Sequence, residues 1–413
     1  MKPRWKTRAL WIGAILIVFI ASILYQPAAS RTGSLLVWTN NRVYVMDIDT
    51  LTLERIAPAA PHEVIAPSPG CRGQASAPCW IVVGSRLFRV DVGAGGSEVR
   101  EIPLPVGEDY LWIDSPVSWS PDGYHIAYSL MKRETERFDL FVVSAGDDQV
   151  KITAEDIDPD LAATWTPGCA DGLTAPECRI GYKKMPGQQE QGGFLASIIG
   201  YTPATEDVEQ WSITPDRIFE LRWSADGELL YSRPKRHFLR ARDHAPAYRM
   251  PQGGQLANIS PSATYTVYYQ PFTLEGCESD DCIQLGVWLE SATSTERAER
   301  RLIYNLPVSD QSDGLNFIPV WANDSRSFVF FQDGNLIHYD IVKDEGTIWY
   351  KEVGDKLRSV PEFAPNETAV AFVDNQGQGH SDYRLLVINP RLDPVEHVIE
   401  TETGFKILAW LPN

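Results

Sequence analysis

The sequence of 413 residues lacks the compositional extremes and the short motifs that identify many protein classes at sight. Glycine contributes 30 residues and proline 29, and only 22% of side chains are charged, which excludes collagen, a coiled coil and a disordered polymer. The chain has no Gly-x-Ser-x-Gly nucleophile motif, phosphate-binding loop, His-Glu-x-x-His zinc motif or Cys-x-x-Cys pair. We therefore predict no catalytic residue, no cofactor and no metal site.

Acidic side chains are missing from the first 33 residues, which carry five basic ones: Lys2, Arg4, Lys6, Arg8 and Arg31. The whole chain has 37 basic and 55 acidic groups, so residues 34–413 hold 32 basic and 55 acidic groups and a formal charge of −23. A body this negative repels phosphate, and binding of nucleic acid depends on neutralising phosphate. The charge excludes nucleic acid as a partner.

Residues 9–25 form the one uncharged stretch long enough to cross a bilayer. As a helix this stretch measures about 26 Å, close to a hydrocarbon core of about 30 Å. The basic tip 1–8 stays in the cytoplasm under the positive-inside rule, so we predict a signal anchor at 9–25, a linker at 26–33 and an extracytoplasmic body at 34–413, in the periplasm or at the cell surface. The alternative is a signal peptide cleaved after the small residues 28–30.

Six cysteines occur as three local pairs, and this even number suits an oxidising compartment. A zinc site would need four ligands that converge from two closely spaced pairs, and no such spacing occurs. We predict three short disulfide-closed loops: Cys71 with Cys79, Cys169 with Cys178, and Cys277 with Cys282.

A short turn motif recurs along the body. Its clearest copy is Trp-Ser-Pro-Asp-Gly at 119–123, followed by Trp-Ser-Ala-Asp-Gly at 223–227, and the segments at 165–169 and 67–71 share one frame that ends in Pro-Gly-Cys. Counting degraded copies, the motif starts at 67, 119, 165, 223, 259, 321, 363 and 410, a mean spacing of about 49 residues. Periods of roughly 40–50 residues with several short strands are typical of β-propeller blades.

One repeat shows how such a unit folds. The turn at 120–123 joins a strand that ends at Trp119 to a strand at 125–128, because proline and Asp-Gly supply turn geometry. The segment 138–143 is rich in β-branched and aromatic residues, and 150–152 is a short outer strand. This pattern predicts a four-stranded antiparallel blade, and the tryptophan at its head is expected to pack against the next blade.

The two ends of the body are incomplete repeats. Segments 35–38 and 43–47 are later strands of a blade without a preceding turn motif, whereas 405–411 is an inner strand with nothing after it. Pairing these ends would close the ring and remove exposed sheet edges. The pattern predicts an all-β fold, a closed β-propeller for which we favour eight blades over the alternative of seven.

The pentapeptide at 119–123, the Ile-Ala-Tyr strand after it and a later strand that ends in Asp resemble the repeat of the TolB-like β-propeller family. Some prolyl peptidases carry the same repeat. The resemblance spans most of residues 60–413 and implies a propeller used mainly for protein interaction. TolB itself has an additional N-terminal α/β domain, whereas here a membrane segment leads directly into strands.

Two charged segments were considered as sites. The acids of 155–160 alternate as in calcium loops, but Leu161 and Pro167 replace the required Gly and Glu, so we interpret the segment as a solvated loop between blades. A basic run contrasts with the acidic body, and it is either a solvated strand face or a docking patch for an acidic partner. The run comprises Arg233, Lys235, Arg236, Arg240 and Arg242.

These observations together predict a membrane-anchored extracytoplasmic propeller that acts as a protein-binding or scaffold module, as an accessory subunit of a membrane complex. The membrane and an unidentified protein are its expected partners. The alternative is a hydrolase or lyase with a site at the mouth of the central channel, which would require convergent histidines and carboxylates.

Overall fold

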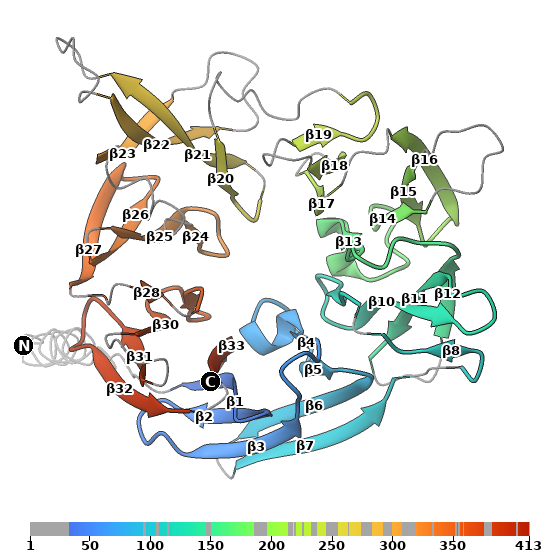
Figure 1. Cartoon of the computed structure of the whole chain (residues 1–413), viewed down its shortest axis with the longest axis horizontal. Coiled ribbons are helices and arrows are strands. Elements are labelled where there is room, and N and C mark those ends of the chain that lie inside the picture. Colours follow the sequence, from blue (N-terminus) through green and yellow to red (C-terminus); the bar gives the residue numbers. More distant parts are fainter. Residues whose placement is uncertain are drawn as a thin grey trace, which may run out of the picture.

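The computed structural model describes most of residues 33–412, which form a ring of strands around a central axis (Figure 1). Within that range it leaves out the following residues: 94–95, 105–106, 114, 146–149, 186–195, 214–217, 219, 225–226, 233–237, 245–254, 263, 274–282, 292–299, 308–318, 333, 352, 354–355, 358, 376–381 and 402–403. The predicted membrane segment at 9–25 and residues 26–32 of its linker lie outside the described residues. Within the described part, no helix is long and apolar enough to cross a bilayer.

Eight antiparallel sheets follow one another around the ring, so the structure is an eight-bladed β-propeller. We number the blades from the sheet that contains the first strand. Blade 1 consists of β33 (Phe405–Leu411), β1 (Ser34–Thr39), β2 (Arg42–Asp47) and β3 (Leu53–Pro58). Blade 2 consists of β4 (Ile65–Pro67), β5 (Cys79–Val83), β6 (Arg86–Gly93) and β7 (Gly96–Pro103).

Blades 3 to 5 continue the order from the channel outward. Blade 3 has β8 (Tyr110–Leu111) and β9 (Ser118–Trp119), both paired with β10 (His125–Lys132), then β11 (Phe138–Ser144) and β12 (Val150–Ala154). Blade 4 has β13 (Thr164–Trp165), β14 (Ile180–Lys184), β15 (Ala196–Thr202) and β16 (Asp207–Ile213). Blade 5 shows three strands among the described residues: β17 (Glu220–Trp223), β18 (Leu229–Ser232) and β19 (Phe238–Arg240).

Blades 6 to 8 complete the ring. Blade 6 has β20 (Gln255–Ile259), β21 (Tyr265–Thr273), β22 (Ile283–Ser291) and β23 (Arg301–Pro307). Blade 7 has β24 (Val320–Trp321), β25 (Ser327–Gln332), β26 (Asn335–Asp340) and β27 (Glu345–Lys351). Blade 8 has β28 (Lys356–Leu357) and β29 (Glu362–Phe363), both paired with β30 (Val370–Asn375), then β31 (Asp382–Ile388) and β32 (Val395–Glu400).

The closure of the ring is as the sequence predicts. The last strand, β33, pairs antiparallel with the first, β1, in a register that places Leu35 opposite Trp410 and Thr39 opposite Phe405. The four-stranded blade predicted from the repeat at 119–152 is also confirmed, as β9 to β12. Because β33 pairs with β1, the inner edge of the first strand is covered, and β33 becomes the innermost strand of blade 1.

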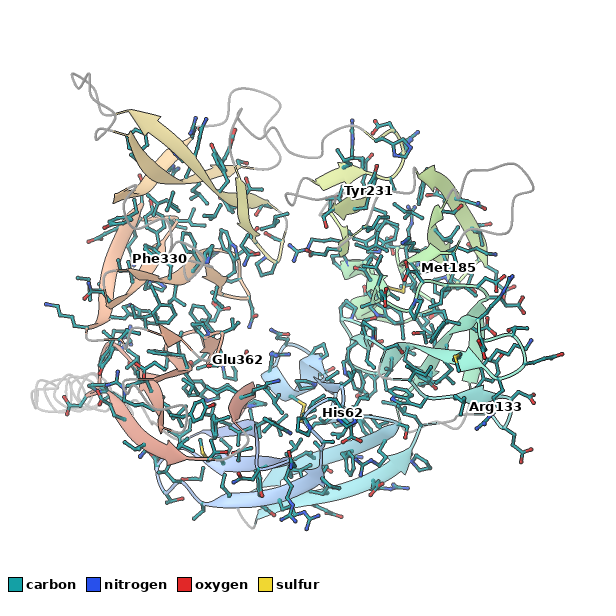
Figure 2. The ribbon with its side chains drawn as sticks, viewed as in Figure 1. His62, Arg133, Met185, Tyr231, Phe330 and Glu362 are labelled. Atoms are coloured by element: carbon teal, nitrogen blue, oxygen red, sulfur yellow. A yellow bond between two sulfur atoms is a disulfide. The ribbon has the colours of Figure 1, made fainter. Side chains whose placement is uncertain are left out.

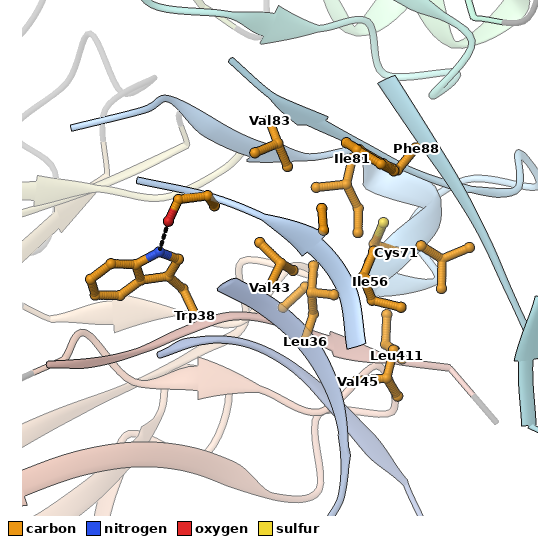
Figure 3. Packing of buried hydrophobic residues seen from close by; sticks show 14 residues of the cluster. Leu36, Trp38, Val43, Val45, Ile56, Cys71, Ile81, Val83, Phe88 and Leu411 are labelled. Carbon is orange, nitrogen blue, oxygen red and sulfur yellow. Dashed lines mark hydrogen bonds between the residues drawn. The ribbon is translucent and has the colours of Figure 1, made fainter. Parts of the chain in front are cut away.

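Apolar side chains fill the spaces between adjacent blades rather than one central core. The cluster between blades 1 and 2 contains Leu36, Val43, Ile81 and Phe88, all less than 3% exposed (Figure 3). In the same view Trp38 donates a hydrogen bond of 3.0 Å from Nε1 to the carbonyl oxygen of Ala59. Each blade therefore depends on its neighbours, as in other repeat folds.

The second residue of the turn motif makes the hydrogen bonds that close the turn. In the copy at 119–123, Ser120 N donates to the His125 carbonyl at 2.9 Å, and His125 N donates back to Ser120 Oγ at 2.9 Å. Gly123 follows with φ of +74°, a conformation that favours glycine, and its N–H donates to the Ser120 carbonyl. Asp122 accepts the Tyr124 N–H and contacts His125 Nδ1, both at 2.9 Å. The motif is thus a self-contained turn.

The tryptophan at the head of the motif joins neighbouring blades, but its hydrogen bond goes to the preceding blade and not to the next one, which the repeat predicts. Trp119 Nε1 donates to the Ala66 carbonyl of blade 2 at 3.0 Å, and Trp223 Nε1 donates to the Thr164 carbonyl of blade 4 at 3.2 Å. The partner is the inner strand of the preceding blade in both cases. These tryptophans are structural.

Antiparallel order gives the ring two different faces. One side carries the turns that join the first strand to the second and the third strand to the fourth in each blade, and we call it the turn face. We call the opposite side the loop face. Ser34 pairs with Leu411, at the position where blade 1 would have its first turn. The chain therefore enters the propeller, and leaves it, on the turn face.

Candidate functional site

Two of the turns on this face carry disulfides. The predicted bonds Cys71–Cys79 and Cys169–Cys178 are both present and close loops in blades 2 and 4. Each loop contains a short 3₁₀ helix, η1 (Pro69–Arg72) or η2 (Pro167–Asp171). The third predicted pair, Cys277 and Cys282, lies outside the described residues.

Both disulfide loops are enlarged versions of the common turn. Ser68 N donates to the Trp80 carbonyl at 2.8 Å, and Trp80 N donates to Ser68 Oγ at 3.0 Å. Thr166 makes the same pair with Arg179, at 3.0 and 2.9 Å. These are the hydrogen bonds that Ser120 makes in the short turn, so the insertion is held between two strands without loss of the motif.

The disulfide loop of blade 2 contacts blade 8 and the closing strand β33. Arg72 Nε donates to Glu362 Oε1 of blade 8 at 2.6 Å, and Arg72 Nη2 donates to the Leu408 carbonyl of β33 at 2.8 Å. Figure 1 shows η1 projecting toward the channel between β4 and β33, and Figure 2 marks Glu362 on the channel side of blade 8. One arginine thus connects three blades.

Burial governs the charge of this pair. The Glu362 side chain is 20% exposed and that of Arg72 is 31% exposed. Desolvation raises the pKa of the Glu362 carboxyl above its usual value, while the neighbouring Arg72 charge and its hydrogen bond act in the opposite direction. Without Arg72, Glu362 would be a partly buried carboxylate with no cation beside it.

Two further contacts fix the same loop. Gln74 Nε2 donates to Asn323 Oδ1 in the first turn of blade 7 at 2.6 Å. Gly73 has φ of +66°, and a side chain built there would lie 3.4 Å from Pro412 and 3.5 Å from Pro365. The loop therefore touches blades 1, 7 and 8 and acts as a clamp over this part of the channel mouth.

A pocket of about 260 Å³ lies beside the clamp, at the seam between blade 8 and the closing strand. Three segments line it: the first turn of blade 8 at 364–369, the third turn region at 387–395, and the end of β33 at 410–412. All three segments belong to the turn face. We call this the seam pocket.

Carboxylates gather next to the seam pocket. Asp393 is exposed at its lining, and Glu367 lies in the turn that forms one wall. Asp324 N donates to Glu367 Oε1 at 3.0 Å. Burial raises the pKa of Glu367, and the charge of Asp324 raises it further. The backbone N–H groups of Asp324 and Asn323, in the first turn of blade 7, act in the opposite direction. Asp393, Glu367 and Asp324 therefore lie in neighbouring turns of this sector of the turn face.

Exposed apolar side chains also mark the turn face. Five large ones occur at its turns or at the adjoining strand starts, each in a different blade: Leu53, Tyr124, Val208, Leu302 and Val342. Val342, between β26 and β27, is 76% exposed. Single apolar residues on a surface are ordinary, but their repetition on one face gives that face a ring of contact points.

The predicted basic patch is only partly visible. Arg233, Lys235 and Arg236 lie outside the described residues. Arg240 forms ion pairs with Asp243 at 2.9 Å and Glu228 at 3.7 Å, and Arg242 is exposed. The charge of Arg240 is therefore already compensated by residues of its own blade.

The acidic segment 155–160 is fixed by cations rather than freely solvated. Asp158 is 8% exposed and pairs with Lys183, and Asp156 Oδ2 accepts from Arg137 Nη1 at 2.9 Å. These contacts explain why the alternating acids form a connection between blades 3 and 4. Among the described residues, no group of three or more His, Cys, Asp or Glu side chains could hold a metal ion.

Histidine does not gather at the channel in the part of the chain that the structure describes. Burial lowers the pKa of His338. It lies on β26, the third strand of blade 7, stacked on Trp349 with ring centroids 4.2 Å apart. This position is remote from the inner strands, so His338 has a packing role.

Comparison with known proteins supports the fold. No family model and no curated protein matches the chain. Among solved structures, a eukaryotic initiation factor is 10% identical, with a TM-score of 0.51, 92% of this chain and 98% of that chain covered. An oligogalacturonate lyase from Vibrio parahaemolyticus is 12% identical (TM-score 0.42; 86% and 98% covered), and TolB from Acinetobacter baumannii is 11% identical (0.33; 90% and 79%). At such identities the likeness concerns the fold alone.

Proposed function

We propose that the protein is a membrane-anchored, extracytoplasmic β-propeller that binds a partner protein through its turn face. The observation that carries this proposal is the seam pocket, a recess with apolar and acidic lining on a face that also bears five of the ten exposed large apolar side chains among the described residues. The clamp made by the Cys71–Cys79 loop supports it, because a binding surface gains affinity when its parts are held in place before binding.

The point of chain entry gives the partner a location. Ser34, the first residue of β1, lies on the turn face, and the proposed anchor ends at residue 25. A fully extended linker of eight residues reaches about 27 Å at most. The turn face is then directed toward the bilayer, and the partner is a membrane protein or a domain close to the membrane surface. The two disulfides agree with an oxidising compartment.

Site-specific crosslinking in intact cells tests the proposal. A photoreactive residue at Val342 probes the turn face, and one at Glu134, an exposed residue in the turn between β10 and β11, is the matched control on the loop face. We expect a discrete adduct with one partner from position 342 and none from position 134. Adducts from 134 alone, or no adduct from 342, would contradict the assignment of the binding face.

A second candidate, an enzyme acting at the channel mouth, is favoured by one observation. Glu362 is a carboxyl with a raised pKa beside an arginine at the edge of the channel, and such pairs also occur in active sites. If this were the site, Glu362→Gln would abolish turnover of a substrate while the adduct from position 342 persisted. The proposed binding role expects the adduct and no activity that depends on Glu362.

A further inference from the structure

The seam pocket combines apolar walls with one exposed carboxylate. Val387, Leu392 and Val395 contribute aliphatic surface from blade 8, and Trp410 contributes an aromatic ring from the closing strand. Asp393 is exposed at the same lining and has no hydrogen bond or ion pair to any of the described residues. An apolar wall with one carboxylate suits a ligand that has an aliphatic stem and a cationic end.

The two asparagine side-chain oxygens of the pocket accept hydrogen bonds within their own turns. Asn366 Oδ1 accepts from Thr368 N at 3.2 Å and from Thr368 Oγ1 at 2.8 Å, which closes the first turn of blade 8. Asn389 Oδ1 accepts from Arg391 N at 3.0 Å in the outer turn. The side-chain amide nitrogens of these two asparagines remain as donors. The pocket therefore offers amide donors for backbone carbonyls and one carboxylate for a cation.

Charge selects the same kind of ligand. Glu367 and Asp324 lie in adjacent turns on the same sector, and residues 34–413 carry a net charge of −23. Arg391 is the basic residue nearest to Asp393 in sequence, and the structure gives no ion pair between them. A bound cation would lower the electrostatic free energy of this cluster, whereas an anion would be repelled.

The size of the pocket limits what enters it. Its volume of about 260 Å³ falls below the roughly 300–1,000 Å³ of sites that enclose whole small-molecule ligands. A single long side chain, delivered by a polypeptide that stays outside, is a suitable occupant. We infer that the seam pocket receives one arginine or lysine side chain of a partner polypeptide, with its charge on Asp393 and its stem against the aliphatic wall. This inference rests on the proposed function and names the chemistry of the contact.

Peptide binding to the detergent-solubilised full chain tests the inference. The probe is acetyl-Ala-Arg-Ala-amide, and its neutral counterpart contains citrulline, which keeps the shape and loses the charge. Saturation-transfer NMR reports which protons of the peptide contact the protein. We expect transfer to the arginine side chain, at least tenfold weaker affinity for the citrulline peptide, and a similar loss in Asp393→Asn.

A matched variant separates the pocket from general surface charge. Asp171 is an exposed aspartate at the end of η2, in blade 4 of the same face, and has no partner among the described residues. Asp171→Asn removes the same charge and should leave the affinity for the arginine peptide within twofold of wild type. Equal losses in Asp393→Asn and Asp171→Asn, or equal affinity for both peptides, would overturn the inference.

The two proposals can fail separately. If position 342 captures a partner but Asp393→Asn leaves both the adduct and the peptide affinity unchanged, the turn face binds without the seam pocket, and the inference is wrong. If the arginine peptide binds through Asp393 but position 342 captures nothing, the pocket has the inferred chemistry, and the proposal that a partner protein docks on the turn face in cells is wrong.

Discussion

The two disulfide loops of the turn face have the same frame and different reach. Each begins at a Ser or Thr whose backbone N–H and side-chain hydroxyl both bond to the residue at the start of the next strand. Each is closed by a disulfide around a 3₁₀ helix. The residue after the first cysteine differs: it is Arg72 in blade 2 and Ala170 in blade 4. Arg72 contacts blades 8 and 1, whereas a side chain built at Gly172 in the second loop would meet nothing within 4 Å.

The difference separates two roles that a disulfide loop can have. Closing a loop of nine or ten residues removes entropy from the unfolded chain, worth about 2.5 kcal/mol in either blade. Among the described residues, the first loop is the one that adds contacts between blades distant in sequence, since Arg72 and Glu362 are 290 positions apart. The covalent frame stabilises its own turn, and the side chain it presents determines whether the turn also joins blades together.

The largest effect is expected from removing each disulfide in turn. Cys169→Ser with Cys178→Ser should lower the free energy of unfolding by about 2.5 kcal/mol, the value for loop closure. Cys71→Ser with Cys79→Ser should lower it by about 4 kcal/mol, because the Arg72 contacts are lost as well. Urea unfolding of the two double variants measures this. Equal losses would mean that the clamp adds nothing to stability.

A smaller effect isolates the clamp without touching the disulfide. Arg72→Ala leaves Glu362 partly buried without its cation and should cost about 2 kcal/mol. Replacing Glu362 by Gln in that background should restore part of the loss, because the uncompensated charge is then gone. If the double variant were less stable than Arg72→Ala alone, the carboxylate would not be the source of the penalty.

The pH dependence of stability depends on the raised pKa of Glu362. A carboxyl whose pKa is higher in the folded state favours folding below its unfolded value of about 4.3, and this contribution is lost as the pH rises through the folded value. Wild type should therefore lose stability relative to Glu362→Gln between about pH 4 and pH 7. Arg72→Ala should show a larger loss over the same interval. Denaturation at both pH values checks the sign, and a gain for wild type would contradict it.

The smallest effect concerns the exposed contact of the clamp. Gln74→Ala removes one hydrogen bond to Asn323 at the surface and should cost about 0.5 kcal/mol. Asp171→Ala, an exposed change in the other loop, should cost less than that. Thermal unfolding of both variants beside Arg72→Ala orders the contacts. A loss for Gln74→Ala as large as that for Arg72→Ala would mean that the amide hydrogen bond stabilises the clamp as much as the ion pair does.

The features set by local sequence could be predicted. The Ser-Pro-Asp-Gly turn closes with its own side chains, so the strands of blade 3 and two disulfide pairs were readable from neighbouring residues. Eight and seven blades were harder to separate because the region around Pro67, or the short 36-residue unit between 223 and 259, could have been less than a full blade. Other copies of the motif lack the serine altogether. At Ala322 and Ala364 the turn is kept by backbone hydrogen bonds of 2.9 Å to Ser327 and Ala369. At these two positions the turn geometry is present although the serine that marks it in the sequence is absent.

The candidate site could not be predicted because its residues are far apart in the sequence. Nothing near Arg72 in sequence indicates Glu362, and the seam pocket combines 364–369, 387–395 and 410–412 with a closing strand whose partner is at the other end of the body. The shared Pro-Gly-Cys frame was the available signal, since the residue next to it is Arg72 in one loop and Ala170 in the other. Contacts between blades depend on the closure of the whole ring.

Crosslinking through position 342 in the disulfide variants tests the central claim, that the clamped turn face is the binding surface. We predict that the yield of the partner adduct falls at least fivefold in Cys71→Ser with Cys79→Ser and stays within twofold of wild type in Cys169→Ser with Cys178→Ser. Yields that fall equally in both variants, or in neither, would contradict the claim.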